Sequence, residues 1–198
     1  TGLSTISEIN KTIKFIRSQN KIYNKNQFLS LLQCTSSYPT PDDEVNLNVI
    51  KTLRKNTNLV VGYSHHNKGD LALISAYLLG AQILEFHFTD TRKGKIFRDH
   101  KISLTPEETK IFIKKIKRIK KQKGKNIKTP TKSEIKSKNI KTFRRAIYLN
   151  KNLKKGEIIK KSDLVCLRPN VGVDARDFKK AIGKKISKNI LAYKKIVF

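Results

Sequence analysis

The pattern of apolar and polar positions between residues 59 and 100 predicts a strand, a helix and a second strand. Residues 59–63 form a short apolar run rich in β-branched side chains, and the run stops at the polar group 64–67. A second apolar run, 71–79, is long enough for about two to three helical turns and is followed by Gly80. A third run covers 83–88. This spacing predicts a βαβ unit whose two strands are parallel neighbours.

Two histidines lie where the strands of this predicted unit end. His66 follows the first strand and His87 lies near the end of the second. In parallel α/β folds, the carboxyl ends of the strands form the edge where sites are built. Two imidazoles converging there suggest one divalent metal ion, with further coordination positions open for water and a substrate oxygen. The alternative is a pair of hydrogen-bonded histidines at a strand edge.

Similar patterns lie on both sides of the βαβ unit. Thr5 and Glu8 have the spacing of a capping box at the start of a helix. Residues 31–34 predict a buried strand, and 42–44 predict the acidic first turn of a helix that runs to about residue 55. Residues 105–108 form another helix start, with Thr, Pro and Glu in capping positions. The apolar stripe of that last helix is expected at Ile111, Phe112, Ile116 and Ile119.

The rest of the chain predicts a linker and a second, smaller domain. From 122 to 141 the apolar residues thin out, and Lys, Gly, Pro, Thr and Ser take over, which is typical of a linker. Residues 142–198 hold short β-branched runs between turn signals, and a unit of under ~60 residues has little core of its own. The first domain, 1–121, holds three clear strands, whereas a closed (β/α)8 barrel needs ~250 residues and eight strands. The sequence therefore predicts the carboxyl half of a larger fold.

The amino-acid composition of the chain limits the kinds of molecule that it is expected to bind. The chain has 198 residues, with 44 Lys+Arg against 15 Asp+Glu and a formal charge of +29. So large an excess of basic over acidic residues suggests nucleic acid or an anionic surface as a binding partner. Lysine, however, greatly outnumbers arginine and is spread through every segment, which indicates a compositional bias rather than a nucleic-acid surface. Two cysteines without CxxC spacing, and no apolar run near the ~20 residues of a membrane span, predict a cytoplasmic protein with no membrane partner.

An ordered series of motifs runs through nearly the whole chain. It consists of TG-L near the start, CTSSYPTP, VNL, VGYSHH, LLGAQILEFHFTD, RDHKISLTPEE, LKKGEII and LRPNVG. In this order the motifs resemble the sialic acid synthase family, the nonulosonic acid synthases. The resemblance implies an α/β fold: the carboxyl-terminal portion of a (β/α)8 TIM barrel, followed by a small mostly-β antifreeze-like (SAF) domain.

The resemblance also implies a reaction and its partners. Members of this family condense phosphoenolpyruvate with an N-acylated hexosamine such as N-acetylmannosamine, which gives a nine-carbon 2-keto sugar acid and phosphate. They use a divalent ion, usually Mn²⁺ or Mg²⁺, and His66 and His87 fall on the two metal-binding histidines of the family. The ion would polarise the aldehyde of the open-chain sugar. A domain-swapped homodimer is the implied assembly.

Further site residues follow from the same resemblance. Ser36 and Ser64 fall where the family contacts the phosphate or carboxylate of phosphoenolpyruvate. Tyr38 and Asp99 fall on residues that hold the amino sugar. Glu85 matches a strand-end carboxylate beside the metal, so that Glu85 and Asp99 are the candidate catalytic residues.

One implied residue lies outside the first domain, and each assignment has a structural alternative. Arg168 matches an arginine that reaches the sugar site of the other subunit, a role in which lysine would be a poor substitute for the guanidinium fork. It could instead pack on its own domain. The two serines could simply cap helices, Tyr38 could be a packed loop residue, and Asp99 could be a solvated loop carboxylate.

The sequence departs from the family at several positions. His65 stands where the family usually has Asp, and Phe86 where it usually has Lys or Arg. These departures bear on sugar specificity more than on the chemistry. The family's first strands carry a catalytic glutamate and the lysines that grip phosphoenolpyruvate, and no counterpart of that region occurs in these 198 residues.

Two hypotheses of different classes follow. The first is a synthase fragment that is inactive as an isolated chain unless an amino-terminal piece completes the barrel. The alternative is a non-catalytic remnant or SAF-type module that binds anionic glycan through its lysines, with an affinity that salt weakens. A metal-dependent hydrolase has no nucleophile or base motif to support it.

Overall fold

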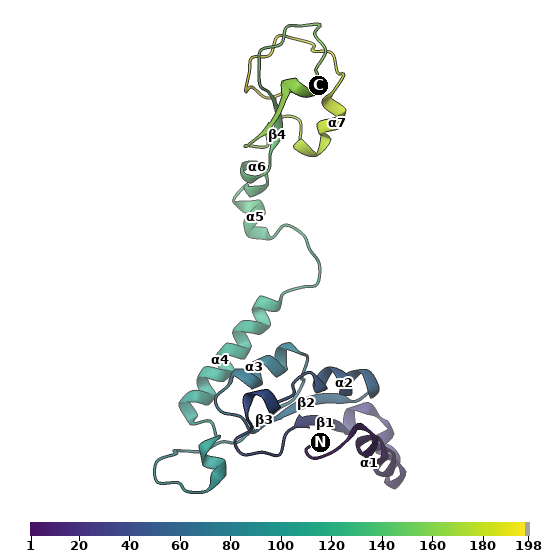
Figure 1. Ribbon diagram of the computed structural model, residues 1–198, viewed down its shortest axis with the longest axis vertical. Helices are drawn as coiled ribbons and strands as arrows, with labels where there is room; N and C mark the ends of the chain where they lie inside the picture. The colour runs from purple at the N-terminus through teal and green to yellow at the C-terminus, as the bar shows by residue number, and fades with distance from the viewer. Residues whose placement is uncertain (197–198) are drawn as a thin grey trace. The chain divides into compact units, whose positions relative to one another are not determined.

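The computed structural model describes residues 1–196, which form two compact units (Figure 1). The first unit is Thr1–Gly124 and the second begins at Lys125. This division lies within the segment that the sequence predicts as a linker. Residues 197–198, the end of the predicted second domain, lie outside the described residues.

The first unit is built on a parallel sheet of three strands. The strands are β1 (Ser30–Cys34), β2 (Val60–His65) and β3 (Leu84–Phe86), and their order is β1-β2-β3. Helix α3 (Leu71–Leu78) connects β2 to β3, which confirms the predicted βαβ unit. A parallel bridge between Phe88 and Leu104 adds one more chain segment beside β3.

Two further helices begin at the predicted signals. Helix α1 (Ile6–Gln19) starts at a capping box between Thr5 and Glu8, and α4 (Pro106–Lys123) starts at one between Thr105 and Glu108. The predicted apolar stripe of α4 is correct only in part. Phe112 is buried and Ile116 packs beside it, but Ile111 is 52% exposed.

The predicted helix from residue 42 to 55 is wrong at its start. Helix α2 spans Val49–Asn56, and Asp42–Glu44 instead forms a separate single turn of 3-10 helix. Between them Asn46 has φ of +50°, in the left-handed region that an α-helix does not use. Ile50 and Leu53 of α2 are fully buried.

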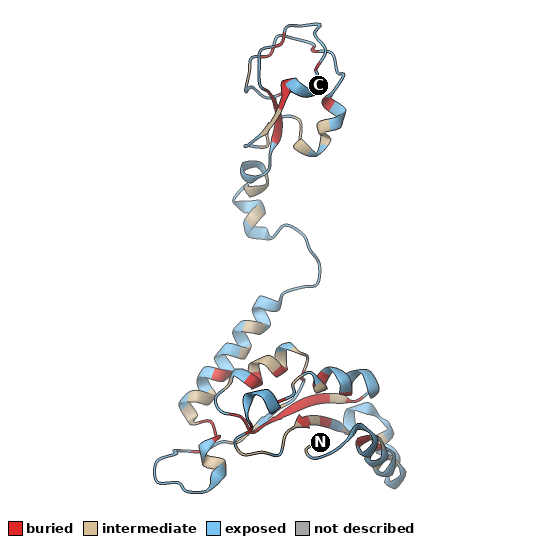
Figure 2. Ribbon diagram, in the orientation of Figure 1, coloured by how far each residue is buried: buried red, intermediate tan, exposed pale blue. Residues whose placement is uncertain are grey.

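Alternation along the strands gives the sheet two different faces. Val61 and Tyr63 of β2 lie in the hydrophobic core, which α2 and α3 cover, and Figure 2 shows β2 largely buried. Because successive side chains of a strand point to opposite faces, Gly62, Ser64 and the following His66 face away from these helices. The predicted site residues of β2 therefore lie on the face opposite to the helices.

Gly62 is a position where the fold allows no side chain. A Cβ added there would lie 2.6 Å from the backbone oxygen of Ile83 and 2.4 Å from Cδ2 of Leu32. Since the oxygen belongs to the neighbouring backbone, it cannot move aside without disturbing the sheet. We expect Gly62→Ala to lower the free energy of unfolding by about 3 kcal/mol, measured by urea unfolding followed by circular dichroism.

Gly94→Ala is the matched control for this prediction. Gly94 has φ of +73°, in the left-handed region, and a Cβ there meets nothing within 4 Å. Gly94→Ala should therefore lower the free energy of unfolding by only about 1 kcal/mol, the cost of a Cβ on a left-handed backbone. Equal losses in the two variants would contradict the tight packing inferred at Gly62.

The second unit combines short helices with an antiparallel strand pair. Helix α5 (Lys132–Lys136) lies inside the predicted linker, where a capping box at Thr131 and Glu134 starts it, and α6 (Asn139–Phe143) begins inside the linker and ends just beyond it. Strand β4 (Ala146–Leu149) pairs with β5 (Leu164–Leu167), and α7 spans Phe178–Ala181. The core of this unit consists of Ile147, Leu149, Leu153, Ile159, Leu164, Ala181, Ile186, Ile190 and Ile196.

Both units therefore have α/β structure, whereas the assignment of the first unit to the carboxyl-terminal portion of a barrel and the mostly-β character of the second domain stay predictions. Within residues 1–196, the structure has no helix that is both long and apolar enough to cross a membrane.

Candidate functional site

The strand register aligns three polar side chains across the sheet. Cys34 of β1 pairs with Ser64 of β2, and Ser64 pairs with Glu85 of β3. The Ser64 hydroxyl donates a hydrogen bond of 2.7 Å to Oε1 of Glu85. Two of the predicted site residues are thus connected directly, at the carboxyl ends of neighbouring strands.

His66 and His87 lie side by side just beyond this row. Their ring centroids are 5.3 Å apart, with 48° between the ring planes. His66 is buried, and its Nδ1 lies 2.8 Å from the backbone oxygen of Thr35. A carbonyl oxygen only accepts hydrogen bonds, so Nδ1 carries the proton and Nε2 keeps a free lone pair. The backbone after β1 thereby fixes the form of His66 that can bind a metal.

Tyr38 packs against both histidines. Its ring centroid lies 4.2 Å from that of His66 and 5.9 Å from that of His87, the second contact being edge-on. The guanidinium of Arg98 lies on the Tyr38 ring at 4.4 Å from its centroid. Tyr38 is therefore a wall of the site, held between the histidine pair and a cation.

Asp99 approaches the pair from the 3-10 turn Arg98–Lys101. Its Oδ2 lies 3.7 Å from Nδ1 of His87, and its Oδ1 lies 3.5 Å from Nε of Arg98. Oδ1 is also buried without a hydrogen-bond partner in the described part of the chain. A buried carboxylate oxygen in this condition is costly unless a ligand satisfies it. Oδ1 therefore has an ion-pair contact with Arg98 but no hydrogen bond, and it keeps the capacity to accept one.

The other two predicted residues have different surroundings. Ser36 is exposed in the loop after β1, where a Cβ added to Gly2 would come within 2.1 Å of its hydroxyl oxygen. Gly2 and Ser36 therefore lie in close contact. Arg168 is an exposed residue of the second unit, with its guanidinium 5.8 Å from the centroid of the Phe143 ring.

The site suits a divalent ion bound by two nitrogen ligands. No group of three His, Cys, Asp or Glu side chains is arranged to hold a metal within residues 1–196. His66 nevertheless presents Nε2 beside His87, and a buried Asp99 oxygen lacks a partner. The donor set fits an ion that takes its remaining ligands from water and substrate oxygen. The metal roles of His66 and His87 stay a prediction.

The two departures from the family pattern lie on the helix side of the sheet. His65 is almost fully buried, with Nε2 2.9 Å from the backbone oxygen of Gly69 and Nδ1 3.3 Å from the Tyr63 hydroxyl. Burial lowers the pKa of His65 to about 4, so its ring is neutral at pH 7. The ring of Phe86 packs edge-on against Phe112 at 5.6 Å. Neither departure changes a residue of the histidine pair, which consists of His66 and His87.

His65 can be tested as a structural residue. Because His65 accepts from the Tyr63 hydroxyl and donates to the Gly69 oxygen, His65→Phe removes the partner of the buried Tyr63 hydroxyl and of the Gly69 backbone oxygen. We expect the free energy of unfolding to fall by about 2 to 3 kcal/mol, and by about 1 kcal/mol in Tyr63→Phe. The double variant should lose less than the sum of the two. Strict additivity in urea unfolding would contradict the inferred hydrogen bond.

Sequence patterns did not single out three contributors to this site. Thr35 contacts His66 through its backbone oxygen, and the position of a backbone oxygen cannot be predicted from a motif of side chains. Arg98 is one basic residue among many in a lysine-rich chain, so only its position on Tyr38 distinguishes it. Gly2 contacts Ser36 across a sequence separation that local patterns do not cover.

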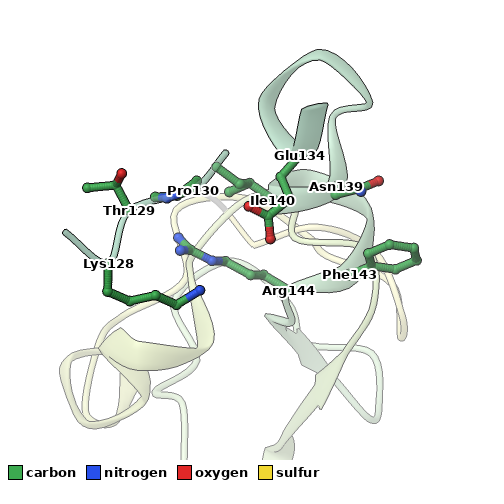
Figure 3. Close-up of a pocket in the computed structure, with 8 residues that line it drawn as sticks. All are labelled: Lys128, Thr129, Pro130, Glu134, Asn139, Ile140, Phe143 and Arg144. Carbon is green, nitrogen blue, oxygen red and sulfur yellow. The ribbon is translucent and has the colours of Figure 1, made fainter. Parts of the chain in front are cut away.

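A separate hollow of about 530 Å³ lies in the second unit, around α5 and α6. Figure 3 shows the Arg144 side chain extending between Lys128 and Glu134. Among the described residues, none of the predicted site residues lines this hollow. It therefore does not extend the candidate site.

Comparison with known proteins gives two family matches. The model of the NeuB family matches residues 1–128, and that of the SAF domain matches residues 144–192. The chain is 37% identical to the N,N'-diacetyllegionaminic acid synthase of Campylobacter jejuni, over 96% of this chain and 55% of that protein. It is 33% identical to a pseudaminic acid synthase of Campylobacter jejuni, over 96% of this chain and 53% of that protein.

A solved structure gives a consistent match. The crystal structure of the N-acetylneuraminic acid (sialic acid) synthetase of Leptospira borgpetersenii, in complex with citrate, aligns with a TM-score of 0.59 and 31% identity. The alignment covers 70% of this chain and 46% of that one. The chain thus spans about half the length of the curated relatives it matches.

Proposed function

The chain belongs to the NeuB family and carries a SAF domain, and from this premise we propose that it forms part of a nonulosonic acid synthase. The reaction is the condensation of phosphoenolpyruvate with an N-acylated hexosamine, which gives a nine-carbon 2-keto sugar acid and phosphate. The observation that carries the proposal is the histidine pair. His66 directly follows β2 and His87 directly follows β3, yet their rings lie 5.3 Å apart beside Tyr38.

The sugar would bind between Tyr38 and Asp99. The Tyr38 ring offers an apolar face next to both histidines, and Oδ1 of Asp99 is a buried acceptor that a sugar hydroxyl would satisfy. A hydroxyl donating to a carboxylate forms a charge-assisted hydrogen bond, which is stronger than a neutral one. Held in this way, the aldehyde of the open-chain sugar lies beside the histidine pair.

In the reaction, carbon 3 of phosphoenolpyruvate attacks the aldehyde carbon and water adds to carbon 2. Loss of phosphate from carbon 2 then leaves the ketone, so one water is consumed for each phosphate released. A divalent ion, Mn²⁺ or Mg²⁺, held by His66 and His87 would supply Lewis acidity at the aldehyde oxygen. Glu85 precedes His87 by two residues on the same strand face and already accepts a hydrogen bond from Ser64, so this carboxylate can take the proton of the water.

The experiment compares the chain alone with the chain joined to an amino-terminal segment. The segment is either the one encoded upstream or that of the Campylobacter jejuni relative, because the chain covers 55% of that protein. We expect no phosphate release from phosphoenolpyruvate by the chain alone, and sugar-dependent release by the joined protein. Release by the chain alone would refute the inactivity of the fragment, and folded joined proteins without release would refute the synthase assignment.

A further inference from the structure

A basic hollow lies beside the candidate site. It has a volume of about 470 Å³, within the range of small-ligand sites. It is lined by Pro39, Lys68, Arg92, Lys95, His100 and Lys101. Among the described residues, this lining includes no carboxylate, whereas five of its six members carry a basic nitrogen. Pro39 joins the hollow to the site, because the preceding residue is Tyr38.

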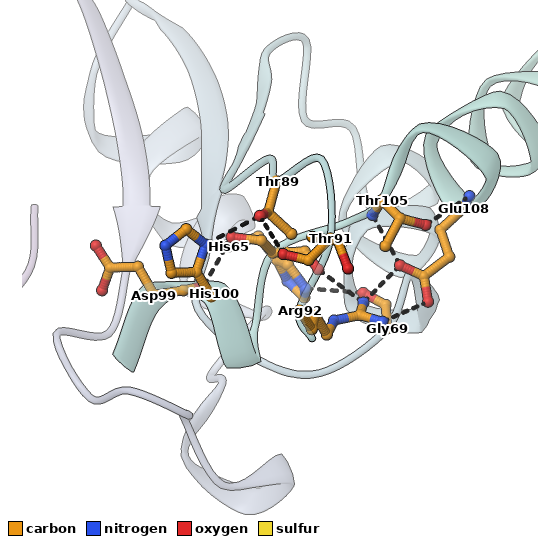
Figure 4. A network of polar contacts seen from close by, with 10 residues as sticks. His65, Gly69, Thr89, Thr91, Arg92, Asp99, His100, Thr105 and Glu108 are labelled. Atoms are coloured by element: carbon orange, nitrogen blue, oxygen red, sulfur yellow. Dashed lines mark hydrogen bonds and ion pairs between the residues drawn. The ribbon is translucent and has the colours of Figure 1, made fainter. Parts of the chain in front are cut away.

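The turn Arg98–Lys101 contributes residues to both the candidate site and the basic hollow. Figure 4 shows Asp99 and His100 pointing in different directions, with His100 toward Thr89. The Thr89 hydroxyl donates to the backbone oxygen of Thr91 at 2.8 Å, so it accepts from Nδ1 of His100 at 2.9 Å. Nε2 of the neutral ring then carries a lone pair, so His100 forms a wall of the hollow, and the donors for an anion are Arg92 and the lysines.

Arg92 is held firmly at the wall of the hollow. Its guanidinium donates to the backbone oxygen of Ser103 and to both oxygens of Glu108, and Figure 4 shows Arg92 beside Glu108. Glu108 is itself fixed, since it closes the capping box of α4 with Thr105. A guanidinium anchored on one side keeps its remaining N–H donors oriented for an anion.

The three lysines supply charge that a ligand can use. Lys95 contacts Asp90 at 3.3 Å, but this pair is exposed, and such pairs contribute little to stability. Lys68 and Lys101 are exposed and have no carboxylate partner in the described part of the chain. Both ammonium groups are therefore available to an anion in the hollow.

We propose that this hollow is a binding site for a phosphate group. Phosphate carries about −1.5 to −2 charges at pH 7 and offers several acceptor oxygens, which suits a fixed guanidinium combined with mobile ammonium groups. The phosphate site itself does not depend on the proposed function. Only the identity of the molecule that carries the phosphate rests on that function. That molecule is either a phosphorylated sugar held at Tyr38 or free inorganic phosphate.

Binding of inorganic phosphate to the full chain, followed by phosphorus NMR, tests the site without any turnover. Lys68→Ala/Lys101→Ala should weaken binding at least about 10-fold, the factor that 1.4 kcal/mol corresponds to. The matched control is Lys114→Ala/Lys117→Ala, which removes the same charge from the exposed face of α4. The control should change binding less than about 2-fold. Equal effects of the two double variants would overturn the proposal, because the binding would then reflect only the net charge.

A second arm distinguishes the two sources of phosphate. The probes are N-acetylmannosamine 6-phosphate, N-acetylmannosamine and inorganic phosphate. Tighter binding of the phosphorylated sugar than of either other probe, lost in Lys68→Ala/Lys101→Ala, supports the site and assigns the phosphate to the sugar. Equal binding of phosphorylated sugar and inorganic phosphate, lost in the same variant, supports a site for free phosphate. Because neither arm uses catalysis, failure of the synthase assignment would leave both results interpretable.

Discussion

His66→Ala and His87→Ala should each weaken Mn²⁺ binding by the chain at least about 100-fold. Even changes to residues that only orient metal ligands cost 10- to 100-fold in metal affinity, so removal of a ligand should cost at least as much. The Nδ1–H of His66 is held by the Thr35 backbone oxygen, which leaves Nε2 for the ion. Electron paramagnetic resonance of free Mn²⁺ gives the affinity directly.

Two controls make the metal prediction specific. His100→Gln changes a histidine whose Nδ1 faces Thr89 instead of the pair, and it should leave Mn²⁺ binding unchanged. Circular dichroism should show native secondary structure in all variants. Mn²⁺ affinities of His66→Ala and His87→Ala within about 3-fold of the unchanged chain would mean that the rings form a hydrogen-bonded pair without a metal role.

Asp99→Asn should lower kcat/KM for the hexosamine about 100-fold in the joined, active protein. The Oδ1 atom of Asp99 pairs with Arg98 but accepts no hydrogen bond in the described part of the chain, so a sugar hydroxyl is expected to form a charge-assisted hydrogen bond there. Such bonds contribute about 1.5 to 3 kcal/mol, which corresponds to roughly 10- to 150-fold. Steady-state phosphate release at varied sugar concentration measures the change.

The control for Asp99 is Asp90→Asn. Asp90 lies nearby in sequence, but its side chain is exposed and pairs with Lys95. Its substitution should leave kcat/KM for the sugar within about 2-fold, since exposed pairs contribute little. The KM for phosphoenolpyruvate should stay unchanged in both variants. An equal loss in Asp90→Asn and Asp99→Asn would show that Asp99 acts only through the net charge of the loop.

The sequence predicted the centre of the site because periodicity alone determines it. A strand, a helix and a strand force β2 and β3 to be parallel neighbours, so His66 and His87 fall at one edge. Capping boxes at Thr5 and Thr105 are equally local signals, and both helices start there. The family resemblance is confirmed over residues 1–128 and 144–192.

Other features depend on contacts that local patterns do not encode. The acidic run at 42–44 suggested a helix start, but the left-handed backbone at Asn46 delays α2 to Val49. Low apolar content predicted a linker, and within it a capping box starts the short helix α5. The approach of Asp99 to His87 depends on how the loop between β3 and α4 folds back, which no short motif determines.

The most direct test of the synthase assignment is metal-dependent phosphate release from phosphoenolpyruvate by the joined protein, with a panel of N-acylated hexosamines. The double variant His66→Ala/His87→Ala is the control. The account predicts release that requires both metal and one class of sugar, and that the control abolishes. A folded joined protein that releases no phosphate with any sugar would contradict it, and a salt-sensitive glycan affinity that survives loss of both histidines would then favour a binding module.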